Sequence, residues 1–383
     1  GLVGSEMCIR DSLPMLPDTF RLEVIKQSAK QFQAVKAQLN RQDVDQVVIA
    51  TDAGREGELV ARLILKKTGC KKPLKRLWIS SVTDKAIRDG FAHLKDGKDY
   101  EPLYDAAMSR AEADWMVGIN ATRALTCKYN AQLSCGRVQT PTLAMIARRE
   151  EQIRQFVPKP YYGLSMRAEG VRFQWKDEKS HSAQSFDKER VQKLFDGLKG
   201  KEAVISSVKK APKRTEAPLL YDLTELQREA SRRYDYSAKE TLNIMQRLYE
   251  NHKVLTYPRT DSRYLTADIL PTIKERLRAC SIGPYKLLAG RLINQPLPAK
   301  PSFVNDKKVS DHHAIIPTEQ FVQLDHMTID ERRIYDLVVR RFLAVLYPAC
   351  EYEQTAVEAT AAGEHFYCLL YTSPSPRDRS VSR

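Results

Sequence analysis

The spacing of apolar residues predicts an α/β segment near the start of the chain. Between Val24 and Arg41 the apolar positions are three or four residues apart, which predicts a helix. Residues 46–51, with the apolar run 47–50, predict a buried strand ending at Asp52, and residues 56–67 return to helical spacing. The order helix, strand, turn and helix is typical of an α/β domain.

Helical and strand-like stretches alternate after this segment. A further strand is expected over residues 77–82, and residues 84–155 have a mostly helical pattern rich in alanine and arginine. Residues 161–175 and 203–208 alternate in polarity like half-buried strands. The basic run at 209–216 contains a proline and predicts a linker.

A second helical region is expected to begin near Leu223, and strand patterns return at residues 352–362 and 365–367. The sequence therefore predicts a β unit that is split by a helical insertion. It shows no internal repeat.

The composition favours several domains and a polyanionic partner. A chain of 383 residues with 42% hydrophobic residues can fill more than one core, so we expect two to four domains. The net charge of +14 favours nucleic acid as a partner if the charge is clustered on one face, and an ordinary basic soluble protein is the alternative.

The longest apolar stretches, such as residues 342–347, are far shorter than the ~20 residues of a membrane span, which argues against a membrane protein. The cysteines form no C-x-x-C pair, which argues against a zinc ribbon and a disulfide framework and favours the cytoplasm. The seven cysteines are Cys8, Cys70, Cys127, Cys135, Cys280, Cys350 and Cys368.

Both ends of the chain differ in character from the rest. Residues 1–12 and 368–383 resemble translated adapter sequence, and we interpret them as artefacts that should be left out of fold reasoning. Genuine flexible termini are the alternative, since serine, proline and arginine enrichment also suits disorder. The informative chain on this interpretation covers residues 13–367.

Acidic residues follow the first predicted strand. Asp52 stands at its carboxyl end, where open α/β sheets place their ligands, and Glu56 follows within one turn. These carboxylates could share Mg²⁺, which takes few protein ligands and keeps waters or phosphate oxygens. The alternative is structural: Asp52 would cap the helix, and Glu56 and Glu58 would complement its dipole.

Tyr257 lies in the string T-Y-P-R-T-D-S. A phenol with an unperturbed pKa near ~10 is a weak nucleophile at neutral pH and needs neighbours that stabilise the developing charge. Arg259 can offer its fork of donors to a phosphate. A tyrosine with a nearby arginine is by itself more often a core or surface residue.

Three further segments have candidate phosphate or proton chemistry. Arg137 stands in a glycine-containing loop before a predicted helix, where backbone N–H groups attract anions, although a capped helix start is the alternative. Arg110 on the preceding helix could contact phosphate or simply pair with Asp114 four residues later. His312 and its neighbour His313 make a poor metal pair, so we expect no zinc site there.

Four motifs together resemble type IA DNA topoisomerases, in that family's order and over nearly all of residues 13–367. They are T-D-A-G-R-E-G-E, S-C-G-R-V-Q-T-P-T, T-Y-P-R-T-D-S and D-H-H-A-I-I-P-T. The segment T-D-A-G-R-E-G-E resembles the acidic motif D-x-D-R-E-G-E of the Toprim domain, with Gly54 in place of the second aspartate. With R-A-E-A-D-W and D-H-H-A-I-I-P-T, it is most similar to the topoisomerase III-like branch.

The resemblance implies roles for individual residues. Tyr257 would attack a DNA phosphate to form a 5′-phosphotyrosyl link, assisted by Arg259, His312 and Glu56. Asp52 and Glu56 would bind Mg²⁺. The DNA-contacting residues implied by the motifs are Arg110, Gly118, Ser134, Cys135, Gly136, Arg137, Val138, Gln139 and Arg259.

The implied fold class is multidomain α/β plus α: a truncated Toprim domain, helical DNA-groove and tyrosine-bearing domains, and a β-rich arch that closes a toroid. The expected segments are an artefact (1–12), partial Toprim domain (13–95), helical DNA-groove domain (96–158), first part of the arch (159–218), tyrosine-bearing helical domain (219–330), return helix and arch strands (331–367), and a second artefact (368–383).

The implied function is ATP-independent and Mg²⁺-dependent: the enzyme cuts one DNA strand, passes another and reseals the break. DNA, mainly single-stranded, is the expected partner of a monomeric, cytoplasmic protein. A catalytically inactive single-strand-binding fragment is the alternative, because we see no earlier strand ending in glutamate and no following lysine upstream of Asp52. A Toprim primase or nuclease would have no use for the Tyr257 string.

Overall fold

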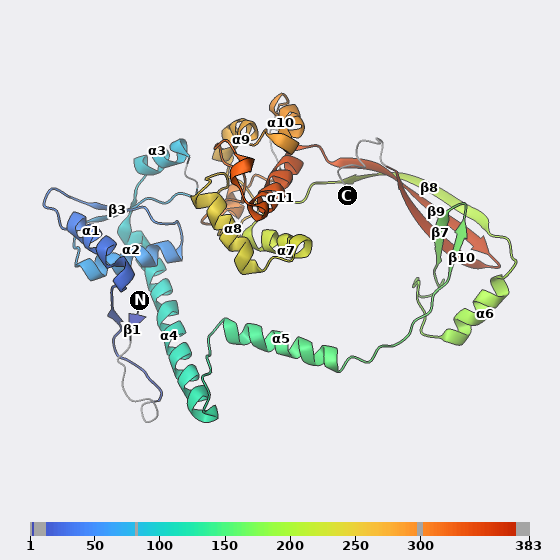
Figure 1. Ribbon diagram of the computed structural model, residues 1–383, viewed down its shortest axis with the longest axis horizontal. Coiled ribbons are helices and arrows are strands. Elements are labelled where there is room, and N and C mark those ends of the chain that lie inside the picture. Colours follow the sequence, from blue (N-terminus) through green and yellow to red (C-terminus); the bar gives the residue numbers. More distant parts are fainter. Residues whose placement is uncertain (1, 4–12, 81–82, 297–301, 373–383) are drawn as a thin grey trace. The chain divides into compact units, whose positions relative to one another are not determined.

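The computed structural model describes residues 2–3, 13–80, 83–296 and 302–372 and divides into two compact units (Figure 1). Unit 1 combines residues 1–149 with 218–346, and unit 2 combines residues 150–217 with 347–383. The second unit is therefore built from two separate stretches of sequence, as the split β unit predicted.

A small sheet with helices packed around it forms the α/β segment of unit 1. Its strand order is β3-β4-β5, with β3 and β4 parallel and β5 antiparallel. Ile49 of the sheet packs on Ala61 and Leu65 of α2 to form a core. The elements of this segment are β1 (Leu2–Val3), β2 (Arg21–Leu22), η1 (Lys26–Ser28), α1 (Ala29–Leu39), β3 (Val47–Ile49), α2 (Arg55–Thr68), β4 (Leu74–Arg76), α3 (Asp84–Ala92), β5 (Lys95–Asp96) and η2 (Gly97–Tyr100).

Two long helices follow, α4 (Glu101–Tyr129) and α5 (Gln139–Arg154). Helix α4 packs along α2 and ends at Asn130, whose φ of 46° is in the left-handed region that asparagine tolerates. The loop after Asn130 leads into α5. Polar and apolar side chains alike are exposed along α5.

The helical region that contains Tyr257 is the best-packed part of unit 1. Helix α11 buries an apolar face that includes Ile334, Val338 and Phe342. Its elements are α7 (Leu223–Tyr234), α8 (Ala238–Glu250), η3 (Ala267–Thr272), α9 (Ile273–Ala279), η4 (Gly283–Tyr285), α10 (Lys286–Ile293), η5 (Asp306–Lys308), η6 (Leu324–His326) and α11 (Ile329–Leu346).

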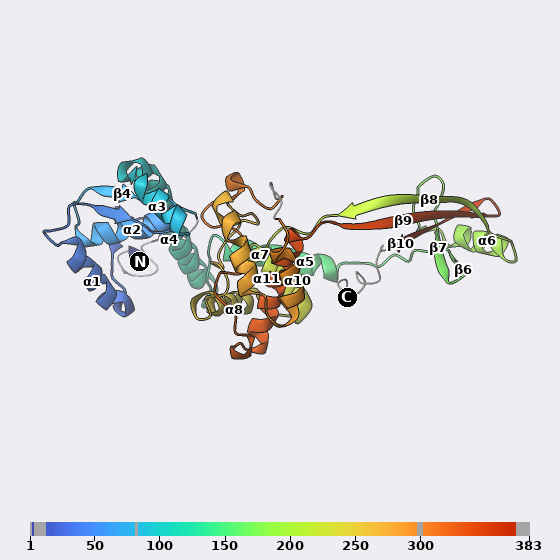
Figure 2. The same ribbon diagram turned by 90° about the horizontal axis from the view of Figure 1, so that it is seen from above.

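Unit 2 is an antiparallel sheet with one helix against it (Figure 2). The sheet order is β6-β7-β10-β9-β8, and its core contains Trp175 and Phe366. Leu194 and Leu198 of the helix pack against this core. The elements are β6 (Ser165–Ala168), β7 (Val171–Trp175), α6 (Lys188–Leu198), β8 (Val204–Thr215), β9 (Cys350–Ala361) and β10 (Glu364–Thr372).

Two sequence predictions about these elements are wrong. The basic run at 209–216 is no linker, because β8 continues through it to Thr215 and pairs with β9. Strand β8 is an edge strand exposed on most of its length, so its basic second half needs no apolar alternation and tolerates Pro212. The strand expected at 77–82 lies earlier, at β4, and residues 77–80 form no strand, while 81–82 lie outside the described residues.

Helix α6 was not anticipated. At the other end of unit 2, β10 runs through the expected boundary at residue 368 and pairs with β9 as far as Thr372. The interpretation of residues 1–12 and 368–383 as artefacts stays a prediction, and most of both stretches lie outside the described residues. Among the described residues, no helix combines the length and the apolar character of a membrane span.

Candidate active site

Tyr257 lies in an extended segment between α8 and η3, packed between two aromatic side chains. Its ring is 4.3 Å from the ring of His312, centroid to centroid, and 5.5 Å from that of Tyr249 on α8. Main-chain hydrogen bonds join the Tyr257 segment to the segment that contains His312; in one of them Thr256 N donates to the Ile316 carbonyl at 3.0 Å. The fold thus brings together the T-Y-P-R-T-D-S and D-H-H-A-I-I-P-T strings, which are more than 50 residues apart in sequence.

The pKa of the Tyr257 phenol is raised. Partial burial is the largest cause and the negative charge of Asp52 adds to it, while the Arg259 guanidinium acts in the opposite direction. Arg259 is exposed beside the phenol. The side chain is therefore a neutral phenol at neutral pH, and a reaction at its oxygen needs a further positive charge or a proton acceptor.

Asp52 lies beside the same histidine. Its Oδ1 is 3.6 Å from Nε2 of His312, and about half of its side chain is exposed. Asp52 therefore belongs with His312 and Tyr257 in one group. This group joins the end of the first parallel strand to the tyrosine-bearing region.

Glu56, by contrast, points towards helix α4. It lies in the first turn of α2, is largely exposed, and its Oε1 is 3.3 Å from Nη1 of Arg110. Arg110 also lies 3.9 Å from Asp114, the pairing that the sequence left as an alternative. The two candidate metal ligands therefore share one turn but have different protein neighbours.

The turn from Asp52 to Glu56, called the acidic turn below, is held in place by Arg76. The sequence did not reveal this role. Its buried guanidinium donates to the main-chain carbonyls of Thr51 at 2.7 Å and Asp52 at 2.5 Å. It also forms an ion pair of 2.9 Å with Glu58, which is equally buried. Glu58 is thus a structural acid rather than a ligand, and no sequence motif pointed to Arg76 as its partner.

Gly57 is needed for the close approach of this turn to its helix. A Cβ at this position would lie 2.2 Å from the carbonyl oxygen of Asp52. The second glycine of the motif therefore allows Asp52 to fold back on α2.

His312 and His313 differ sharply in environment. They lie in a non-helical segment. Nδ1 of His313 is 2.8 Å from the Ala314 carbonyl, and burial lowers the pKa of His313 to about 4. His313 is therefore a neutral structural residue, whereas His312 faces Asp52 and Tyr257.

The candidate DNA-contacting loop is attached to α4. The hydroxyl of Thr122 accepts from Cys135 N at 3.0 Å, and Gly118 faces the Cys135 carbonyl, from which a Cβ would be 3.8 Å away. Gly136 N donates to the hydroxyl of Thr140 at 3.0 Å at the start of α5. The residues of the loop that lie exposed to solvent are Ser134, Arg137, Val138 and Gln139.

Arg137 forms a bidentate ion pair with Asp114 of α4. The hydrogen bond from Arg137 lowers the pKa of Asp114. The structure therefore brings Arg110, Asp114 and Arg137 together along α4, and Glu56 links this basic group to the acidic turn.

The acidic turn offers oxygen ligands of the kind that Mg²⁺ takes. Asp52 and Glu56 are exposed carboxylates on one turn, which leaves room for the waters or phosphate oxygens that Mg²⁺ retains. Within the described ranges, no three histidine, cysteine, aspartate or glutamate side chains come together as a metal-binding group. The donor set fits a weakly held magnesium ion better than a closed protein cage.

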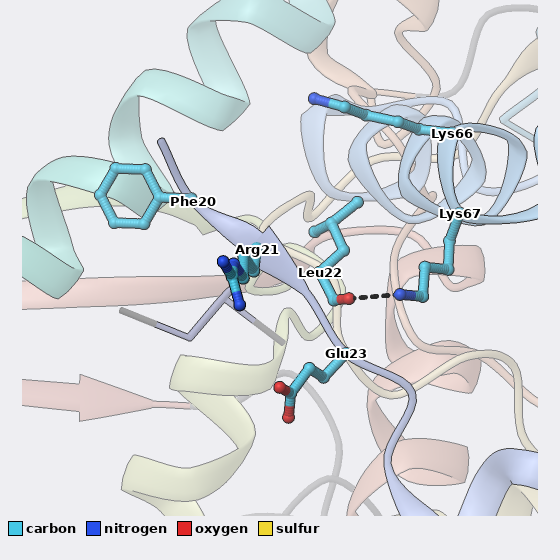
Figure 3. Close-up of a pocket in the computed structure, with 6 residues that line it drawn as sticks. All are labelled: Phe20, Arg21, Leu22, Glu23, Lys66 and Lys67. Atoms are coloured by element: carbon cyan, nitrogen blue, oxygen red, sulfur yellow. Dashed lines mark hydrogen bonds between the residues drawn. The ribbon is translucent and has the colours of Figure 1, made fainter. Parts of the chain in front are cut away.

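A pocket of about 420 Å³ lies elsewhere on the α/β segment (Figure 3). Lys67 donates to the Leu22 carbonyl at 2.6 Å at its edge, so this amine is already engaged. Neither Tyr257 nor the acidic turn lines it. The lining residues are Phe20, Arg21, Leu22, Glu23, Lys66 and Lys67.

Comparison with known proteins identifies the family. A family model described as DNA topoisomerase matches residues 98–371, and a Toprim domain model matches residues 11–82. DNA topoisomerase 3 of Bacillus subtilis (strain 168) is 56% identical over 356 residues, covering 93% of this chain and 49% of that protein. The corresponding protein of Shouchella clausii (strain KSM-K16) is 62% identical, covering 92% and 49%.

A solved structure, full-length topoisomerase I from Thermotoga maritima, shares the fold with a TM-score of 0.68 at 24% identity, over 92% of this chain and 57% of that one. The chain spans about half the length of the curated relatives it matches. The described α/β, helical and antiparallel-sheet parts agree with the fold that the sequence predicted. The chain belongs to the type IA DNA topoisomerase family, on its topoisomerase III-like branch.

Proposed function

We propose that this chain carries the strand-cleavage centre of a type IA DNA topoisomerase, with Tyr257 as the nucleophile. The observation that supports it most directly is the packing of Tyr257 against His312, with Asp52 next to the same histidine. Nucleophile, imidazole and carboxylate come from three distant parts of the sequence, and a merely structural tyrosine would not require this arrangement.

The proposed step is an exchange of one phosphate ester for another. The oxygen of Tyr257 bonds to phosphorus and the bond from phosphorus to the 3′ oxygen breaks, so the fragment that carries the new 5′ phosphate stays linked to the protein and the other fragment ends in the 3′ oxygen. The phenol proton leaves and the departing 3′ oxygen takes one up. Because the phosphotyrosyl bond is still an ester, rejoining by the 3′ hydroxyl needs no ATP.

The surrounding residues have roles that their positions support. Arg259, exposed next to the phenol, would stabilise the scissile phosphate, and His312 would hold or transfer the proton at the reacting oxygen. Glu56 and Asp52 would bind Mg²⁺, which supplies positive charge to the phosphate when bound.

The single strand would reach this centre along α4 and the loop before α5. The proposed contacts are Arg110 and Arg137 to phosphates, with Gly118 and Gly136 allowing close approach of the backbone. The proposed contact loop is Ser134, Cys135, Gly136, Arg137, Val138 and Gln139. A monomeric, cytoplasmic protein with the segment boundaries given above, including an arch that closes a ring, remains part of this proposal.

An inactive single-strand-binding fragment is the second candidate. The observation that favours it is Gly54, which leaves the acidic turn with one carboxylate fewer than the D-x-D-R-E-G-E motif. Binding without chemistry would then depend on the basic groups of α4 and its loop.

Labelled single-stranded DNA distinguishes these functions. With Mg²⁺ present, a 3′-end-labelled oligonucleotide should become attached to the protein, while a 5′-end-labelled one should yield only a shorter free product. Tyr257→Phe should form no adduct. Tyr249→Phe is the matched control, since Tyr249 packs edge-on against Tyr257 and its hydroxyl has no proposed role.

Two other outcomes of this experiment would contradict the proposed function. An adduct that persists in Tyr257→Phe would show that the nucleophile is another residue. Salt-sensitive binding of the strand by the unmodified chain without any adduct would instead support the inactive fragment.

A further inference from the structure

Residue 54 is a glycine because a side chain has no space there. Its backbone conformation does not require glycine. Its φ of −162° and ψ of 176° are extended values that any residue can adopt. A Cβ at this position would lie 2.3 Å from Oδ2 and 2.7 Å from Cγ of Asp311. The carboxyl group of Asp311 therefore occupies the space in which a side chain at residue 54 would lie.

This space is at the start of α2. Gly54 is the N-cap residue of the helix, and no side chain caps it from that position. An aspartate at an N-cap normally accepts hydrogen bonds from the first turn of its helix. In this chain an aspartate from the segment next to His312 stands at the same place.

Asp311 lies among the charged groups of the proposed reaction centre. Burial and the neighbouring carboxylates of Asp261 and Asp52 raise the pKa of Asp311, whereas His312 and Arg55 act against this rise. Asp311 is thus close in charge and in space to both Asp52 and His312.

We propose that Asp311 is a positioning residue that supplies, from the tyrosine-bearing region, the carboxylate that the acidic turn lacks at Gly54. It keeps Asp52 and the start of α2 at a fixed distance from His312 and Tyr257. This inference rests on the proposed function. It also implies that the carboxylates of Asp52, Glu56 and Asp311 come together only while the acidic turn and the tyrosine-bearing region are in contact.

Moving the carboxylate between the two positions tests this proposal. Asp311→Ala and Gly54→Asp should each slow adduct formation with 3′-end-labelled single-stranded DNA by about tenfold or more, as loss of a supporting group at a site typically does. The double variant Gly54→Asp with Asp311→Ala should recover to within about threefold of the unmodified chain, because the two sites are in contact and their effects are not additive.

The matched control keeps the shape and removes the charge. Gly54→Asn with Asp311→Ala should stay slow, and non-covalent binding of the same oligonucleotide should be alike in all variants. The proposal is overturned if Asp311→Ala retains the full rate, if Gly54→Asp is no faster with Asp311→Ala than without it, or if asparagine rescues as well as aspartate.

Thermal unfolding separates this proposal from the proposed function. If the unmodified chain forms no adduct, the function fails, and the contact is decided by Tm alone. Gly54→Ala should lower Tm more when Asp311 is present than in the Asp311→Ala background. Equal losses in the two backgrounds would show that the side chain of Asp311 does not occupy the space beside Gly54.

Discussion

Arg76 and Glu58 form an ion pair of 2.9 Å from which solvent is excluded on both sides. The remaining donors of Arg76 bind the main-chain carbonyls that lead into Asp52, so this pair connects the inside of the α/β segment to the proposed reaction centre. Arg62 completes the arrangement, because its Nε donates to Oε1 of Glu58 at 2.9 Å. The shape of the acidic turn is therefore set by a buried charge network.

The first prediction concerns this network. Arg76→Met should destabilise the α/β segment by about 3–5 kcal/mol, because it leaves the charge of Glu58 buried with only part of its compensation. Hydrogen exchange should show faster exchange of the amides around Asp52 and Gly57. The double variant Arg76→Met with Glu58→Leu should lose less stability than Arg76→Met alone, and an equal or greater loss would argue against the buried pair.

The second prediction concerns Gly57. Gly57→Ala places a Cβ against the Asp52 carbonyl and must displace the turn. A displacement of about 1 Å at a reaction centre can lower the rate about 100-fold, so adduct formation should fall steeply while single-strand binding persists. Gly197→Ala is the control, since a Cβ there meets nothing within 4 Å and should leave the rate unchanged. Full activity of Gly57→Ala would show that the turn does not position Asp52.

The motifs named individual residues of the candidate site, whose roles stay predictions. Tyr257, His312 and Asp52 were each singled out, and the structure brings them together. It could not predict Arg76, because a buried arginine in a short strand has the same local pattern as an exposed one. It also could not pair Gly54 with Asp311, because this contact joins residues that are far apart in the chain.

The fold was predicted less evenly, for physical reasons that differ between elements. Helix α2 buries one side and keeps a helical spacing that a pattern can detect. Strand β8 is an exposed edge strand, and its second half is held by main-chain pairing with β9 without any apolar alternation in the sequence. A basic, proline-containing run was therefore mistaken for a linker.

The third prediction concerns Asp114, which neutralises Arg137 in the absence of DNA. Asp114→Asn should free the guanidinium and tighten binding of a single-stranded oligonucleotide at low salt. Arg137→Gln should weaken binding and reduce the slope of log affinity against log salt by about 0.7 to 1, as loss of one phosphate contact does.

Asp105→Asn is the matched control for charge, because it removes one negative charge from the same helix. It should strengthen binding less than Asp114→Asn does. If the two substitutions act equally, a general change in net charge explains the effect, and the specific release of Arg137 does not.

The last prediction follows from the pKa of His313. Burial lowers this pKa to about 4 from an ordinary value of about 6.5, so the unfolded chain binds a proton there more readily than the folded protein. The stability from the neutral imidazole is fully present above pH 6.5 and is lost as the pH falls, by an amount on the order of 2 kcal/mol at pH 4.5. His313→Gln should be less stable at pH 7 but should lose less stability between pH 6.5 and 4.5 when unfolding is followed across that range.

Protonation of Glu331 contributes little to the change in stability between pH 6.5 and 4.5. The pKa of Glu331 is held near 2, because hydrogen bonds from Arg247 and Thr328 outweigh the opposing effect of burial. Parallel stability curves for the two proteins between pH 6.5 and 4.5 would show that His313 takes up its proton without cost and is not held neutral by the fold.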